Sequence, residues 1–320
     1  MKTGMKITLG CLAMPFVLLL LFGILMLAFR ALPMRPSEPA SANIDQPITT
    51  VTAGQLAAEG LNPGESGALQ PAPVSMNLWL EEGNFTVKAG PAGSGVRVEG
   101  DYDAGMYELQ QQLDKGDSGA PVYNLSFRPR YSMVRRALTH GGVVLDDDTN
   151  RLTIYLPRDL PMALRAQVRK GQSHLELGGL SLRLAVLDLE MGEHRVTVDE
   201  PNPIEMDGFE THAGMGEVKM QNLGNLRAGS ISVWGKMGEI GVDLGRQIAR
   251  DTKLYARMRM GEMKLLLPRG VRINARTSVF LGGSSGEPEE GENEENAGSS
   301  PYHLDVDAGA SFGELKYVRY

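Results

Sequence analysis

The tripeptide Met-Gly-Glu recurs at nearly constant spacing, and this repeat constrains the fold of the chain more than any other feature. It occupies residues 191–193, 215–217, 237–239 and 260–262, with Phe-Gly-Glu at 312–314 as a variant. The central glycines at 192, 216, 238 and 261 are therefore 24, 22 and 23 residues apart. A period of about 20–50 residues is typical of solenoids and arrays, in which each repeat stacks on its neighbours.

Alternating hydrophobicity around each tripeptide predicts a β-strand with one buried face. Before Gly261, the apolar residues Leu254 and Ala256 alternate with polar ones, and alternation resumes after it at Met263 and Leu265. We expect the residue before each glycine and the second residue after it to face the core. The glycine takes a positive φ, and the glutamate points to water. The predicted corner residues are Gly192, Gly216, Gly238, Gly261 and Gly313.

Two all-β geometries fit this pattern. One is a β-solenoid, similar to a β-helix, of 21–24-residue coils with a corner at each glycine. The alternative is an antiparallel β-sandwich of hairpins, each with glycine first in a type II′ turn. The near-constant period favours the solenoid. Gly171 and Gly282 extend the repeat by 21 residues on either side, and residues 74–157 are interpreted as atypical first coils of one domain spanning 74–320.

The N-terminal region predicts a membrane anchor and a tether. Ile7 to Phe29 is a 23-residue stretch without a charged side chain, and as a helix it would extend about 34 Å, enough to cross a hydrocarbon core. The apolar core of a cleavable signal peptide is about 7–15 residues long, so we predict an uncleaved transmembrane helix within residues 1–29. A removed signal peptide is the alternative. Residues 30–73 have linker composition, and the body is expected outside the cytoplasm.

Charge and cysteine content exclude several classes of function. The net charge of −7 argues against a nucleic-acid partner. The single cysteine, Cys11, excludes an intramolecular disulfide and a cysteine-based zinc site. Residues 282–301 contain six glutamates and almost no apolar side chain, so we predict a disordered acidic loop.

No candidate for catalysis or for metal or cofactor binding survives. The sequence from Gly116 to Gly119 resembles the surroundings of a serine-protease nucleophile, but no histidine precedes Ser118, and we interpret it as a turn between two strands. The five histidines lack metal-ligand spacing. The corner glutamates predict a row of like charges, which Lys236 or Arg259 would balance. Trp79 and Trp234 are candidate surface anchors, although packing is the favoured interpretation.

Residues 152–171 (LTIYLPRDLPMALRAQVRKG), residues 178–193 (GGLSLRLAVLDLEMGE) and the later corners carry a resemblance to a known group. They resemble the toast-rack and putative-adhesin families of bacterial envelope proteins, and are similar to the C-terminal domain of LiaF-type cell-wall-stress proteins. The resemblance implies a non-enzymatic binding, adhesion or scaffold module outside the cytoplasm, and the anchor predicted at residues 7–29 would hold it on the cytoplasmic (inner) membrane. It implies an envelope protein or polysaccharide as partner. The alternative it leaves open is a regulator of envelope-stress signalling that binds a membrane partner.

Overall fold

The part of the chain that the structure describes is all-β apart from one short 3-10 turn. A computed structural model describes residues 39–46, 73–116, 119–131, 150–286 and 300–320. The strands are β1 (Pro39–Gln46), β2 (Val74–Ala89), β3 (Val96–Asp103), β4 (Tyr107–Lys115), β5 (Pro121–Pro129), β6 (Arg151–Leu156), β7 (Met162–Glu176), β8 (Leu182–Thr197), β9 (Gly208–Gln221), β10 (Ser230–Asp243), β11 (Thr252–Leu267), β12 (Arg272–Ser285) and β13 (His303–Arg319). The 3-10 turn, η1 (Leu223–Leu226), lies between β9 and β10.

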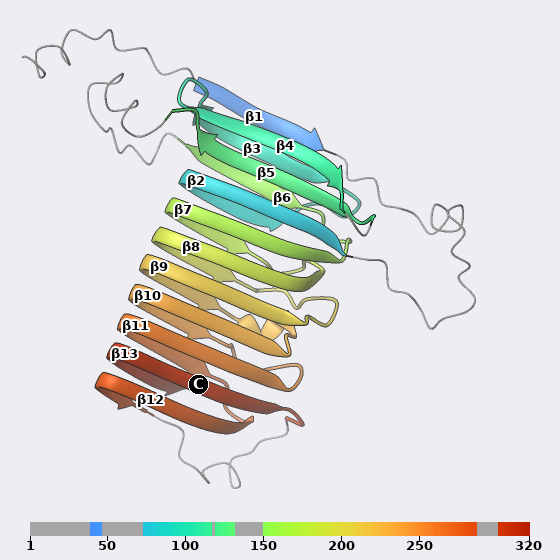
Figure 1. The fold of residues 1–320 in the computed structure, drawn as a ribbon. Coiled ribbons are helices and arrows are strands. Elements are labelled where there is room, and N and C mark those ends of the chain that lie inside the picture. The colour runs from blue at the N-terminus through green and yellow to red at the C-terminus, as the bar shows by residue number, and fades with distance from the viewer. Residues whose placement is uncertain (1–38, 47–72, 117–118, 132–149, 287–299) are drawn as a thin grey trace, which may run out of the picture.

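All the strands join in one large mixed sheet that does not close on itself (Figure 1). Its main part is a stack of parallel strands in the order β2-β7-β8-β9-β10-β11-β13-β12. At the N-terminal end, the first half of β2 pairs with β5 and its second half with β6. The antiparallel pairs β4–β5, β3–β6 and β1–β3 complete this end. Strand β1 falls within the stretch that the sequence assigned to the linker.

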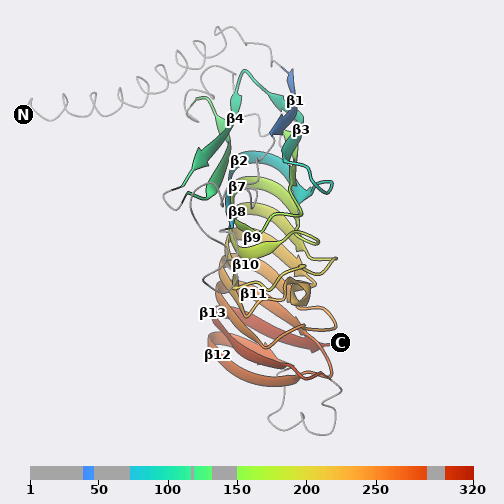
Figure 2. The same cartoon turned by 90° about the vertical axis from the view of Figure 1, so that its right-hand side faces the viewer.

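The repeated glycines lie in register across the stack. Gly192 pairs with Gly171 and Gly216, and Gly261 pairs with Gly238 and Gly313. Each Met-Gly-Glu tripeptide lies inside a continuous strand and not in a hairpin turn. The strands of the stack are strongly curved (Figure 2), and each of these glycines has a positive φ. One repeat therefore corresponds to one long bent strand and its connection to the next.

The glycine is required because neighbouring strands approach closely at the bend. Gly261 has φ +125°, and a Cβ atom there would lie 2.0 Å from the carbonyl oxygen of Gly238. That distance is well below any van der Waals contact, and L residues resist this backbone conformation. The same contact recurs from strand to strand, so the close approach is a property of the whole row.

The core lies on the inner side of the bend. The third residue before the glycine and the second residue after it are buried, as Met258 and Met263 are on either side of Gly261. The residue immediately before the glycine is exposed, with Met260 46% accessible. The prediction that this residue faces the core was therefore wrong. The chain turns toward the core at the glycine, so the side chains on the outer side of the turn do not follow the simple alternation of a straight strand.

The order of strands in space departs from their order in the sequence at the C-terminal end. β13 lies between β11 and β12, so Gly261 stacks on Gly313, and Gly313 on Gly282. From the spacing alone, the repeat that contains Gly282 was expected to stack directly on the repeat that contains Gly261. Strand β12 also continues to Ser285, so the first residues of the predicted acidic loop belong to the sheet. Residues 287–299 lie outside the described residues.

Candidate functional site

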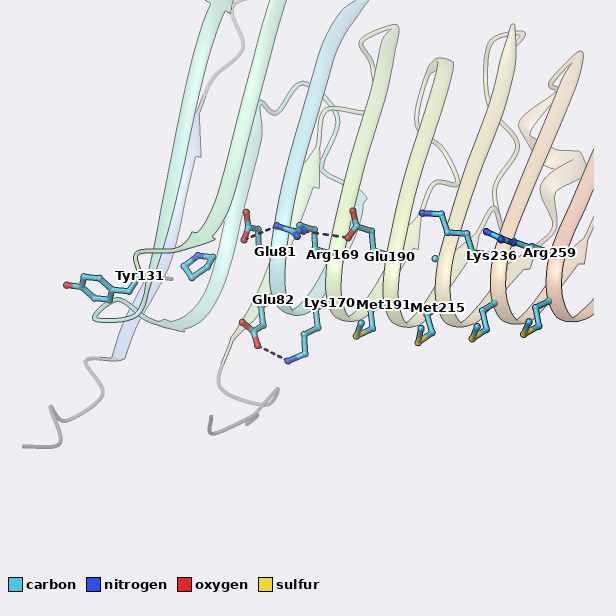
Figure 3. Close-up of a pocket in the computed structure, with 14 residues that line it drawn as sticks. Glu81, Glu82, Tyr131, Arg169, Lys170, Glu190, Met191, Met215, Lys236 and Arg259 are labelled. Carbon is cyan, nitrogen blue, oxygen red and sulfur yellow. Dashed lines mark hydrogen bonds and ion pairs between the residues drawn. The ribbon is translucent and has the colours of Figure 1, made fainter. Parts of the chain in front are cut away.

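The bend carries three rows of side chains on its outer side, one residue per strand in each row. They occupy the positions two before, one before and one after the stacked glycine, and the strand register aligns them along the stack. Because adjacent strands are about 4.8 Å apart, each row is a ladder with regular steps. Figure 3 shows the first two rows side by side.

The row directly before the glycines is an exposed apolar ladder, which we call the methionine ladder. Its members have between 44% and 56% of their surface accessible, and are Met191, Met215, Met237, Met260, Phe312 and Leu281. Each pairs with the next across adjacent parallel strands. Toward β2 the same row changes to Lys170 and Glu82, which form an ion pair at 2.8 Å. The apolar ladder thus has a charged end.

A charged row runs parallel to the ladder and is formed by the residue two positions before the glycine in each strand. Arg169 lies between two carboxylates, 3.7 Å from Glu81 and 3.6 Å from Glu190. Further along the stack, the same row continues with Lys236 and Arg259, which flank Met237 and Met260 (Figure 3). Positive charge therefore accumulates beside the apolar part of the ladder.

These two rows border a shallow groove of about 880 Å³ that crosses β2, β7, β8, β9, β10 and β11. Gly214 widens it, because this row has no side chain on β9. Pro129 and Tyr131, at the end of β5, border the groove beyond β2 (Figure 3). The groove combines flexible thioethers, which adapt to the shape of a neighbouring molecule, with both cations and carboxylates.

The third row is the predicted row of corner glutamates. Glu193, Glu217, Glu239, Glu262 and Glu314 pair in register. The cations that contact this row are Lys219, which contacts Glu217, and Lys316, which lies 3.0 Å from Glu262 and 2.9 Å from Glu314. Hydrogen bonds to Glu314 and Glu262 raise the pKa of Lys316. The prediction that Lys236 or Arg259 interleaves with these glutamates was wrong, because those cations stand on the other side of the glycines.

A buried polar pair on the inner side of the bend was not predicted. The Nδ1 atom of His194 lies 2.9 Å from the Oγ atom of Ser173, and both residues are buried. Burial lowers the pKa of His194 to about 4. The sequence contained one indication that His194 is buried: its position in the repeat on β8 corresponds to the apolar residue Val218 on β9. Both residues also border a hollow of about 370 Å³, together with Phe85, His174 and Glu193.

The other sequence candidates are dispersed or lie outside the described residues. Ser118, His140 and the predicted membrane segment 7–29 are outside them. The strands on either side of Ser118, β4 and β5, form the expected antiparallel pair. Within the described ranges, no group of three His, Cys, Asp or Glu side chains is arranged to hold a metal ion. In the same ranges, no helix has the length and apolarity needed to cross a bilayer.

No known family model matches the chain, and no curated protein matches it. The solved structures that match the chain include the following two. A putative cell adhesion protein from Clostridium sporogenes has a TM-score of 0.43 and 13% identity, over 88% of this chain and 100% of that one. A putative adhesin from Bacteroides fragilis has a TM-score of 0.38 and 11% identity, over 89% and 100%. At these scores neither likeness supports an argument about family or function, so the resemblance to the toast-rack and putative-adhesin families stays a prediction.

Proposed function

We propose that this protein is a non-enzymatic binding module of the bacterial cell envelope: a β-solenoid held outside the cytoplasmic membrane by a single N-terminal helix. The observation that supports binding is the methionine ladder. Soluble proteins seldom expose a contiguous apolar surface without a partner for it. Methionine is also a common choice where a surface must adapt to another molecule, because its unbranched thioether adopts many shapes.

The ladder and its flanking charges favour a protein partner over a small apolar ligand. The groove is open and crosses six strands, about 24 Å at the usual strand spacing. Its apolar part is bordered by Lys236 and Arg259 on one side and by the corner glutamates on the other. A partner with an apolar ridge and charged flanks would match all three rows at once. Anchoring and location are supported by the 23 uncharged residues from Ile7 to Phe29.

Site-specific photo-crosslinking in living cells tests this proposal. A benzophenone amino acid would replace Met215, in the centre of the ladder, or Arg269, an exposed residue in the connection between β11 and β12. We expect a discrete crosslinked protein from position 215 and none from position 269. Changing Met191→Ser and Met237→Ser together should abolish the product while leaving stability within about 0.5 kcal/mol, since both side chains are already exposed. Equal products from both positions would contradict the proposal, as would a product that survives the serine changes.

A further inference from the structure

A second hollow lies on the outer face of the sheet near its N-terminal end, beside Trp79. It measures about 440 Å³ and is bordered by side chains from β4, β5, β2 and β7. This volume falls within the range of about 300–1,000 Å³ that is usual for small-molecule sites. Trp79 is 39% exposed, so much of its indole ring is available to a ligand.

The sheet register explains how the hollow forms. Trp79 pairs with Ser126 on one side and with Gln167 on the other, and Ser126 pairs in turn with Gln110. The small side chain of Ser126 leaves an open space between the indole and Gln110. These two residues are two strand steps apart, about 10 Å. That gap is wide enough for a ring to lie against the indole and still contact the amide.

Polar side chains around the hollow hold one another in place. Asp114 accepts hydrogen bonds from Gln112 at 2.7 Å and from Asn124 at 3.0 Å. Asn124 also accepts one from Asn77 at 2.9 Å. These contacts engage both amide atoms of Asn124, whereas the contact of Gln112 uses its Nε2 atom and leaves its carbonyl oxygen able to accept a hydrogen bond from a ligand. Preorganised polar groups lose little entropy when they bind.

The charged side chains at this site already form ion pairs with other side chains of the protein. Arg128 lies 3.9 Å from Glu108 and donates a hydrogen bond to Gln110 at 3.2 Å. Arg169 is held between Glu81 and Glu190. A charged ligand would have to compete with these ion pairs, whereas a neutral one would not. Glu81 and Arg169 also border the groove along the bend, but no methionine of the ladder borders this hollow.

We propose that this hollow binds a neutral sugar ring of an oligosaccharide. One face of a pyranose presents C–H groups that pack flat against an indole. Its hydroxyl groups both donate and accept hydrogen bonds, as do the amides of Gln110 and Gln112. This inference goes beyond the protein-docking function of the methionine ladder and does not depend on it, because the ladder supplies no residue to this hollow.

The chain has two tryptophans, so fluorescence can assign the response to one of them. In the Trp234→Phe variant of the full chain, Trp79 is the remaining indole. We expect cellotetraose and chitotetraose to shift or quench its emission, and tetragalacturonic acid to leave it unchanged. In the matched Trp79→Phe variant, the remaining Trp234 is also half-exposed but should not respond to any of the three. Absence of a response to both neutral sugars would overturn the proposal, and so would a response to the acidic sugar alone or a response that persists in Trp79→Phe.

Calorimetry gives an independent measure. Trp79→Ala should weaken binding of the responding tetrasaccharide at least tenfold, and Gln110→Ala severalfold, with circular dichroism unchanged for Gln110→Ala. The Met191→Ser/Met237→Ser protein should bind the sugar with unchanged affinity, which separates this site from the groove. Unchanged affinity in both Trp79→Ala and Gln110→Ala would show that the hollow is not the sugar site.

Discussion

His194 occupies a buried position that favours the neutral form of its side chain. Its exposed fraction is 4%, and its Nε2 atom has no hydrogen-bond partner among the described residues. Desolvation lowers its pKa to about 4, whereas the unfolded chain binds the proton near the ordinary value of about 6.5. The unfolded state therefore takes up more protons between these two values. The contribution of neutral His194 to the free energy of unfolding is therefore fully present above about pH 6.5, and it decreases as the pH falls toward 4.

We predict that His194→Val removes most of this pH dependence. Valine matches Val218, its partner on the next strand, and cannot be protonated. The wild-type protein should lose about 3 kcal/mol relative to the variant between pH 7.5 and pH 4, from a shift of about 2.5 pKa units. Urea unfolding at four pH values measures the difference. His212→Val is the matched control, since His212 is on the surface, and should retain the wild-type slope. Parallel pH profiles for wild type and His194→Val would refute the prediction.

At the level of the strand, the glycine row determines where each strand bends and how closely neighbours approach. Each glycine combines a positive φ with contact to the backbone of the preceding strand. Gly241, only three residues after the bend in β10, has neither property: its φ is ordinary and a Cβ atom there would meet nothing within 4 Å. The effects of substituting a glycine at the bend and a glycine away from it can therefore be compared directly.

We predict that Gly261→Val destabilises the protein by at least about 2 kcal/mol, because strained backbone costs about 1–3 kcal/mol and the new Cβ atom would overlap the oxygen of Gly238. Gly241→Ala should be neutral, or stabilising by up to about 1 kcal/mol, through the unfolded state. Midpoints of urea unfolding of the full chain measure both. Equal midpoints for the two variants would show that the row does not constrain the bend.

At the level of the whole molecule, the three C-terminal strands are joined by one short connection and one long connection. The four residues 268–271 join β11 to β12, which lies two strand positions away. Residues 286–302 join β12 to β13, which lies next to it. Removing residues 287–299 would leave Gly286 and residues 300–302, again four residues. A connection of this length already occurs in the same sheet.

We therefore expect the deletion of residues 287–299 to preserve the fold. The loss should be below about 1 kcal/mol, since loop-closure entropy changes slowly with length. The variant also loses six glutamates, so its net charge changes from −7 to −1, and solubility must be controlled by working at dilute concentration. Thermal unfolding by circular dichroism, compared with Gly261→Val, measures the effect. Unfolding of the deletion variant at room temperature would mean that the acidic segment contributes to the core.

The sequence alone determined the all-β class, the repeat and the stacking of the glycines from Gly171 to Gly261. Alternation predicts a strand from its own residues, and a constant period brings like positions into register, as for Gly238 and Gly261. Gly83, which pairs with Gly171 and extends the row of glycines into β2, could also have been predicted. Buried Leu80 and Phe85 have the same spacing around it as Met258 and Met263 have around Gly261. These features are local or strictly periodic, so they can be followed along the chain without knowing the fold.

Only the tertiary structure decided which side chains form the two candidate sites. The exposure of Met260 depends on how the chain turns at Gly261, which alternation does not describe. The placement of β13 between β11 and β12 depends on a long connection whose path no period specifies. The hollow beside Trp79 needs Gln110 and Ser126 from a hairpin that pairs with the first half of β2. Such contacts join residues that are far apart in the sequence, and they depend on many strand pairings at once. A local pattern in the sequence therefore does not reveal them.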